Sequence, residues 1–280
     1  MKSIIITFLL SSASLIAQNF IFVNEIGDFE EASSFSINPS GFIYVADVES
    51  NEVAKLDTLG NVNKFVGGYG WSISSFDEPV DVFANTLHVY IADKNNHRIQ
   101  IFDKDLNFLS EFASSNVDRE ENKFAYPTSC GVSKQGDFFI LDSDNSRIIK
   151  YNLNGNYILQ IGSFDAGQYA LNDPKKFAVS NSEKIFVAEK EKIIVFDVYA
   201  NALNNFLTGI ENKNINITAE HLSINSNNEI KILTLTSNSQ SLISFIPENL
   251  MKNENIVEVS LFRKKLYVLT EKRILIYTRL

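Results

Sequence analysis

The stretch YIADKNNHRIQIFD places Asp93, Asn96, His97 and Arg98 between two apolar runs. An imidazole close to a carboxylate can act as a general acid or base, so these side chains could support catalysis. The same residue types also make tight turns, because Asn and Asp side chains bond the backbone nearby. The choice between chemistry and turn formation depends on the rest of the chain.

A second acid–base pair, Asp142 and Arg147, stands in the same local setting further along the chain. A feature that recurs at one place in successive segments belongs to the architecture. We therefore predict that Asp93 ends one strand, Arg98 begins the next, and the two pair across the neck of a hairpin. Such a pair contributes about 0.5 kcal/mol when it is exposed and more when it is covered.

The only cysteine, Cys130, excludes an internal disulfide framework and a cysteine-based zinc site. It lies in the strand-like run YPTSCGVSKQGDFFILD, where a buried, unreactive thiol is expected. The chain has no G-x-S-x-G elbow and no phosphate-binding loop. We predict no catalytic residue and no cofactor.

Composition favours strands over helices, since the 280 residues include 22 Phe and lack long Ala/Leu/Glu runs. The formal net charge is -9, and basic residues form only short clusters such as Arg263–Lys265. Proteins that bind nucleic acid usually carry a basic face, because phosphate contacts supply much of the affinity. No nucleic-acid partner is expected.

The N-terminus, MKSIIITFLLSSASLIAQNF, has a basic start, a short apolar centre and a small-residue exit after Ala13 or Ala17. This pattern is typical of a secretory signal peptide, and its apolar part is shorter than the roughly 20 residues that span a bilayer. We expect a secreted or periplasmic monomer with no membrane insertion once the signal is removed.

The remainder is a repeat. Four similar segments begin at Phe29, Phe76, Phe124 and Leu171, and these starts are 47, 48 and 47 residues apart. Each segment divides into four strands, of which the second is an unbroken apolar run suited to cover on both faces. The period and the strand count are those of one blade of a β-propeller.

Two weaker copies follow at Ala219–Phe245 and Val257–Leu280, and the last has only three strands. The segment FIFVNEIGDFE near the N-terminus resembles a fourth strand, so it can complete the last blade and remove an exposed edge. The predicted fold is an all-β, six-bladed β-propeller of four-stranded blades, closed by pairing of the N-terminal strand with the C-terminal blade. Its predicted parts are a signal peptide at 1–17, a closing strand at 18–28, and blades at about 29–75, 76–123, 124–170, 171–218, 219–255 and 256–280.

The F-x-x-P start, the YIAD strand and the segment NNHRIQIFD resemble the blade signature of the NHL repeat family, whose name-giving motif begins at Asn96–Arg98. The likeness is strongest over 76–112 and faint in the last two blades; Val53, for example, replaces an expected Arg. The resemblance implies a six-bladed propeller. It does not fix a function, because the family includes sensor domains, protein- and RNA-binding scaffolds and a few enzymes.

The topology assigns the loops to two faces. The turns between second and third strands share a face with the links between blades, so His97 lies on one face and His88 on the other, while His221 is assigned to an inner strand. A zinc site like that of the family's amidating lyases needs ligands that converge, which these histidines do not. Asp81, on an inner strand, can point into the central channel, as in a metal-dependent hydrolase or lyase. No metal site is predicted, and such an enzyme is the alternative function.

The links on the His97 face are long and carry aromatic residues, notably Tyr69, Trp71, Phe164 and Tyr169. Long loops on a rigid ring are common binding sites, and exposed aromatic side chains make good anchors. The competing interpretation is that Trp71 and Phe164 pack between blades. The favoured function is non-catalytic recognition of a protein, peptide or glycan, with a stand-alone sensor subunit as a further alternative. The predicted binding residues are Tyr69, Trp71, Asp81, His97, Tyr169 and His221.

Overall fold

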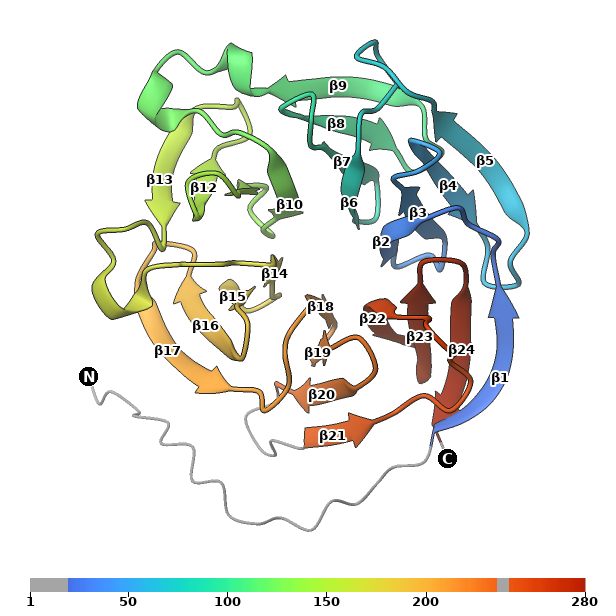
Figure 1. Cartoon of the computed structure of the whole chain (residues 1–280). Coiled ribbons are helices and arrows are strands. Elements are labelled where there is room, and N and C mark those ends of the chain that lie inside the picture. The colour runs from blue at the N-terminus through green and yellow to red at the C-terminus, as the bar shows by residue number, and fades with distance from the viewer. Residues whose placement is uncertain (1–19, 236–241, 280) are drawn as a thin grey trace.

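The computed structural model describes residues 20–235 and 242–279, which form six four-stranded antiparallel sheets around a central axis (Figure 1). The first blade comprises β2 (Ala32–Ile37), β3 (Ile43–Asp47), β4 (Glu52–Leu56) and β5 (Val62–Gly67). The second comprises β6 (Pro79–Ala84), β7 (His88–Asp93), β8 (Arg98–Asp103) and β9 (Phe108–Ala113). The third comprises β10 (Pro127–Val132), β11 (Phe138–Asp142), β12 (Arg147–Tyr151) and β13 (Tyr157–Ile161).

The last three blades complete the ring. The fourth comprises β14 (Lys176–Val179), β15 (Lys184–Ala188), β16 (Lys192–Asp197) and β17 (Ala202–Leu207). The fifth comprises β18 (Asn214–Thr218), β19 (His221–Asn225), β20 (Ile230–Thr234) and β21 (Leu242–Phe245). The sixth comprises β22 (Ile256–Phe262), β23 (Lys265–Thr270), β24 (Ile274–Arg279) and β1 (Phe20–Ile26). The prediction of a six-bladed propeller is confirmed.

The core lies between neighbouring blades. All five residues of β3 and of β11 are buried, because each middle strand is covered on both faces. One apolar cluster joins Tyr44 and Val53 of the first blade to Val82 and Ile91 of the second. Similar clusters between other blades bury the apolar runs that the sequence repeats.

The ring closes where the two ends of the chain meet. β1 pairs antiparallel with β24, with Phe20 opposite Arg279 and Ile26 opposite Ile274 (Figure 1). Phe20 and Ile26 are buried against the last blade and its two neighbours. The predicted closure is confirmed, and β24 has no free edge.

Arg273, just before β24, fastens this closure. Its guanidinium donates to Glu254 at 3.1 and 2.9 Å and also bonds Glu25 of β1. Burial alone would raise the pKa of Glu254, but hydrogen bonds from Arg273, the Met251 amide and Thr270 outweigh it and lower the pKa to about 2.

This lowered pKa predicts acid sensitivity. Ionised Glu254 stabilises the fold at pH values above its ordinary pKa of 4.5, and that stabilisation is lost as the pH falls from about 4.5 towards about 2. We expect Glu254→Gln to melt at a lower temperature than the wild type at pH 7, with the gap narrowing below pH 4.5. Thermal melts followed by circular dichroism measure this gap. A gap independent of pH would contradict the assignment.

The fifth blade begins earlier than expected. Its inner strand, β18, starts at Asn214, whereas the predicted boundary was 219. The strand reads NINIT and follows a polar link without the F-x-x-P start, so the sequence gives little sign of it. His221 consequently begins the second strand of its blade and does not lie on an inner strand.

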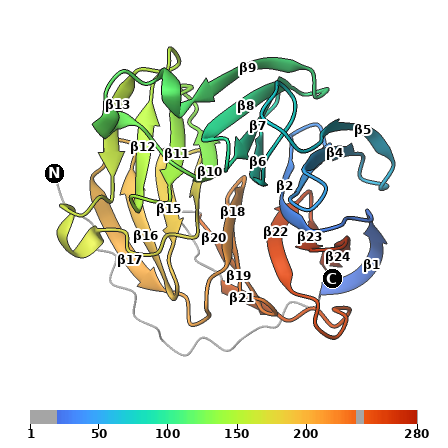
Figure 2. The same cartoon turned by 45° about the horizontal axis from the view of Figure 1, so that its top comes forward.

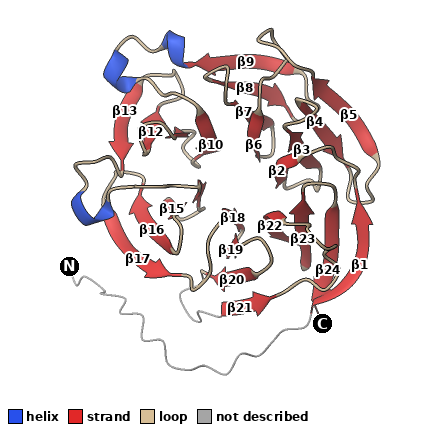
Figure 3. Cartoon of the chain, in the orientation of Figure 1, coloured by secondary structure: helices blue, strands red, loops and turns tan. Residues whose placement is uncertain are grey.

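The two faces of the ring differ in what connects the strands (Figure 2). The link face carries the links between blades and the turns between second and third strands. The turn face carries the other turns. The predicted signal peptide lies outside the described residues, and none of the helices within them (Figure 3) is long and apolar enough to span a bilayer.

Candidate functional site

The innermost strands place one polar residue from each blade around the central axis. Successive members of the first four blades are 47, 48 and 47 residues apart, matching the repeat. We call this set the inner ring. Its members are Ser34, Asp81, Ser129, Lys176, Asn216 and Glu258.

Lys176 is the centre of the inner ring. Its ammonium lies 2.8 Å from a carboxylate oxygen of Asp81 and 2.7 Å from one of Glu258, so it joins the fourth blade to the second and sixth. It also donates to Ser34 Oγ at 3.1 Å. These three partners match the three protons of an ammonium group.

The other members complete the network. Ser34 Oγ lies 2.8 Å from oxygens of both Asp81 and Glu258, and Asn216 donates to Glu258 at 2.8 Å. The backbone N–H of Cys130 donates to Asp81 at 3.0 Å. All six blades are therefore joined through one buried set of polar groups. Ser129 Oγ is also buried but has no hydrogen-bond partner among the described residues.

Electrostatics keep Lys176 charged. Burial alone would lower the pKa of its ammonium, but the charges of Asp81 and Glu258 and their hydrogen bonds raise it above the ordinary value. The ammonium lies between the two carboxylates. Within 20–235 and 242–279, no group of three or more His, Cys, Asp or Glu side chains is arranged to hold a metal ion.

Cys130 lies beside this network and is fully covered. Burial, with the charge of Asp81 as a second cause, raises the pKa of its thiol well above the ordinary value. A thiol in this state is a poor nucleophile, because the thiolate is the reactive form. The structural role expected for Cys130 fits this environment.

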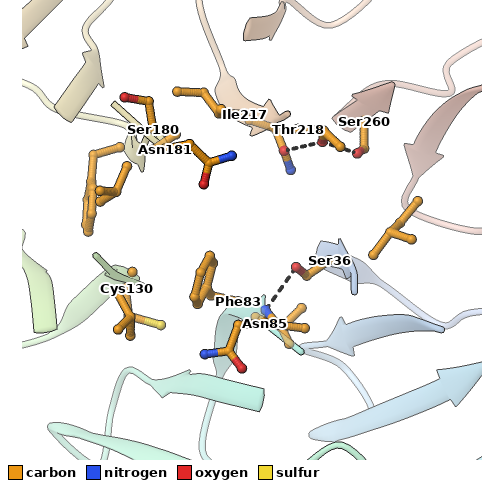
Figure 4. Close-up of a pocket in the computed structure, with 18 of the residues that line it drawn as sticks. Ser36, Phe83, Asn85, Cys130, Ser180, Asn181, Ile217, Thr218 and Ser260 are labelled. Atoms are coloured by element: carbon orange, nitrogen blue, oxygen red, sulfur yellow. Dashed lines mark hydrogen bonds between the residues drawn. The ribbon is translucent and has the colours of Figure 1, made fainter. Parts of the chain in front are cut away.

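A cavity opens from the inner ring towards the turn face. It measures about 560 Å³, and Asp81, Lys176 and Glu258 line its inner end. Its wall includes the residues two positions after each ring member on the inner strands. These are Ser36, Phe83, Gly131, Ala178, Thr218 and Ser260. Figure 4 labels four of them, Ser36, Phe83, Thr218 and Ser260. Five of the six carry side chains no larger than threonine, which explains why the channel is hollow at this level.

The link face carries the aromatic loop, residues 67–75, between the first and second blades. Tyr69 is 71% exposed and Trp71 is 77% exposed, and Ile73 beside them is exposed as well. Phe164, on another link, is 92% exposed. Packing of Trp71 and Phe164 between blades is therefore wrong, because buried residues such as Phe76 already fill that space.

Arg98 holds the backbone of the aromatic loop in place. Its guanidinium donates to the backbone carbonyls of Trp71, Ser72 and Ser75, each at 2.9 Å. Asn96 donates to the carbonyl of Gly70 at 2.9 Å. The loop is thus fixed through its backbone, which leaves its apolar side chains free to face solvent.

The remaining donors of Arg98 bond carboxylates. Nε lies 2.7 Å from Asp93, which is fully buried, and Nη1 lies 2.9 Å from Glu111. Arg147 and Asp142 repeat the pair at 2.9 Å in the third blade. The structural role predicted for this pair is confirmed, and its burial makes it more than an exposed hairpin contact.

His97 lies in the turn before β8 with a φ of 51°, in the left-handed region. Its Nδ1 accepts the backbone N–H of Tyr126 at 3.1 Å, so the neutral ring carries its proton on Nε2. His97 also lines a hollow of about 690 Å³ between the second and third blades. Glu120, Glu121 and Lys123 line the same hollow.

The other predicted site residues lie apart from the aromatic loop. Tyr169 ends a short 3-10 helix, Gly167–Tyr169, and packs half-buried against the core between the third and fourth blades. Asp81 belongs to the inner ring. His221 lies on the turn side of the fifth blade, where burial and the charge of Arg279 lower its pKa. The structure brings together Tyr69 and Trp71, with His97 on the adjoining turn.

Sequence reasoning missed Lys176 as the partner of Asp81 and Glu258 as the second carboxylate on Lys176, and it missed Ile73. The place of Lys176 could have been found in the sequence, since Lys176 follows Asp81 by two repeat periods. The signal that identifies the inner ring is this spacing combined with the polar residue types on inner strands.

Comparison with known proteins agrees with this geometry. A sequence profile of the NHL repeat matches residues 76–102, which contain β6 and β7 and most of β8. Over 100 residues the chain is 32% identical to the protein brain tumor of Drosophila melanogaster. That match covers 35% of this chain and 10% of the relative, so the chain spans about a tenth of the length of that protein.

Solved structures show the same fold at low identity. A streptogramin B lyase superposes with a TM-score of 0.65 at 11% identity, covering 94% of this chain and 99% of that one. Virginiamycin B lyase from Staphylococcus aureus gives 0.62 at 11%, and its catalytically inactive variant with quinupristin gives 0.63 at 10%; each comparison covers 94% of this chain and all of the other. At this identity the likeness concerns the fold alone. The chain is a six-bladed β-propeller that carries an NHL repeat in its second blade.

Proposed function

We propose that this propeller is a non-catalytic recognition scaffold whose aromatic loop binds a protein partner. The observation that supports this most directly is the exposure of Tyr69, Trp71 and Ile73 on a backbone that Arg98 and Asn96 hold in place. Large exposed aromatic side chains are the most frequent anchors of protein interfaces. A loop that is already ordered loses little entropy on binding.

Charge indicates the chemistry of the partner. Acidic residues outnumber basic ones in the links and turns of the link face. In the hollow beside His97, Lys123 is already paired with Glu120, while Glu121 has only a long ion pair with Arg119, at 4.0 Å between two exposed side chains. A partner with an apolar segment flanked by Lys or Arg would complement this surface.

Affinity capture with the purified protein tests the proposal. Because the N-terminal sequence supports export, the capture uses envelope and secreted fractions, with the cytosolic fraction as a comparison. We expect Trp71→Ala and the double variant with Tyr69→Ala to lose one or more captured proteins by at least about tenfold. Tyr199→Ala is the matched control, since Tyr199 is equally exposed but lies on the turn face.

Each outcome bears on a separate claim. Loss with the loop variants and retention with Tyr199→Ala supports the aromatic loop. Equal capture by all variants contradicts it. A partner present only in the cytosolic fraction would contradict export while leaving the loop in place.

The alternative function, a metal-dependent hydrolase or lyase in the channel, has less support. The likeness to the lyases, at 11% identity, concerns the fold alone, and the Lys176 ammonium is already bonded to both channel carboxylates. Stoichiometric zinc or calcium in the purified protein would favour this alternative.

A further inference from the structure

We propose that the cavity on the turn face binds an uncharged, hydroxyl-rich ligand, namely the terminal sugars of a neutral glycan. The cavity is separate from the aromatic loop, because it opens on the opposite face of the ring. The proposal therefore stands or fails independently of protein recognition by that loop.

The cavity has the size of a small-ligand site. Its volume of about 560 Å³ lies within the range of roughly 300–1,000 Å³ that such sites occupy. Its inner end, the floor, is bounded by Asp81, Lys176 and Glu258, which ion pairs hold together across the ring, and its outer end by residues of the turn face such as Asn85 and Asn181. A site bounded at its inner end accommodates the terminal sugars of a glycan better than sugars in the middle of the glycan.

The floor disfavours charged ligands. The three protons of the Lys176 ammonium are engaged by Asp81, Glu258 and Ser34, so it has no free donor for a phosphate or carboxylate. The two carboxylates are buried and have their own partners, which leaves no exposed acid at the floor for a cation. The floor carries two acids and one base, so it repels anions. Lys134 is the one Lys, Arg, Asp or Glu among the other lining residues, and it is exposed at the turn-face mouth of the cavity.

Two positions beyond the inner ring, the wall has a polar side and an apolar side. Ser36, Thr218 and Ser260 stand together on the first, fifth and sixth blades, which are neighbours (Figure 4). Ser36 Oγ accepts the Ala84 N–H at 3.0 Å and keeps its own proton for a ligand. Thr218 and Ser260 share one hydrogen bond at 2.9 Å and retain free lone pairs.

The opposite side presents Phe83, Gly131 and Ala178 from the second, third and fourth blades. In Figure 4 the Phe83 ring projects into the cavity, and the Asn181 carboxamide points into it from the far rim. A pyranose ring has hydroxyl groups around its edge and C–H groups on its faces. It can therefore bond the hydroxyl side of the wall while one face packs on Phe83.

Titration with defined probes tests the proposal. The probes are maltotriose, cellotriose, mannotriose and N,N′-diacetylchitobiose, measured by isothermal titration and by saturation-transfer NMR. We expect at least one to bind at millimolar or tighter affinity. Ala178→Leu, which fills the cavity without removing a hydrogen bond, should weaken that binding at least about tenfold, and Phe83→Leu should weaken it as well. Leu203→Ala, on the outer strand β17, should leave it unchanged.

Other outcomes overturn the proposal. Absence of binding by all four sugars contradicts it, as does binding that Ala178→Leu does not weaken in a protein with an unchanged melting temperature. Two further probes test ligand class. Equal or tighter binding of digalacturonic acid would contradict the charge argument, and tighter binding of an uncharged, blocked tripeptide would assign the cavity to peptides.

Discussion

Replacing Lys176 with methionine should lower the free energy of unfolding by about 3–5 kcal/mol, the usual cost of breaking a buried ion pair. Methionine has a similar length, so the change removes the charge and leaves little empty space. Asp81 and Glu258 would then face each other as buried carboxylates without a cation. Since the inner ring joins all six blades, the loss should affect the whole fold and not one blade.

Chemical denaturation measures this loss. Lys175→Met is the matched control, because the neighbouring Lys175 is more exposed and pairs only with Asp173 on the surface. It should cost less than about 1 kcal/mol. A combined variant with Asp81→Asn, Glu258→Gln and Lys176→Met should recover most of the stability, because no uncompensated charge remains. A loss below 1 kcal/mol for Lys176→Met alone would show that the ring adds little to stability.

Arg98→Ala should cost a similar amount and should also weaken partner capture. The variant leaves the buried Asp93 carboxylate without its guanidinium and frees three carbonyls of the aromatic loop. We expect a loss of about 3–5 kcal/mol in stability. Once its backbone is free, the loop must pay an ordering cost on binding that the wild type avoids.

Arg147→Ala provides the comparison. Arg147 pairs with buried Asp142 and donates to the backbone carbonyls of Glu121 and Lys123 in the link between the second and third blades. Both variants should be destabilised, but only Arg98→Ala should lose the proteins that depend on Trp71. Hydrogen exchange of residues 67–75 should rise in Arg98→Ala and stay unchanged in Arg147→Ala. Equal effects on capture would mean that stability, and not loop order, controls binding.

The repeat predicted the ring well because period and strand pattern are local properties. The spacing between Phe29, Phe76, Phe124 and Leu171 defined four blades, and the likeness of FIFVNEIGDFE to a fourth strand predicted the closure. The boundary at 219 failed because β18 is a short strand, NINIT, and the polar link before it lacks a start signal. Where the local pattern weakens, the period alone does not locate a strand.

The site was harder to predict because its contacts cross the ring. Asp81 was identified as a channel residue, but its ion-pair partner Lys176 lies 95 positions away, and Glu258, which shares Lys176 with it, lies 177 positions away. Both are on blades whose orientation depends on closure. Exposure of Trp71 was equally hidden, since an aromatic residue in a link can pack between blades or face solvent. The space between blades was already filled by residues such as Phe76, which only the assembled structure reveals.

The pairing of β1 with β24 also governs the order of folding during synthesis. The ribosome makes β1 before every other strand of the ring, yet its partner is the last one to emerge. The nascent chain must therefore carry β1 unpaired until β24 has been made, while neighbouring blades assemble beside it. The exposed Asn24 and Glu25 on this strand would discourage premature association with other chains during that wait.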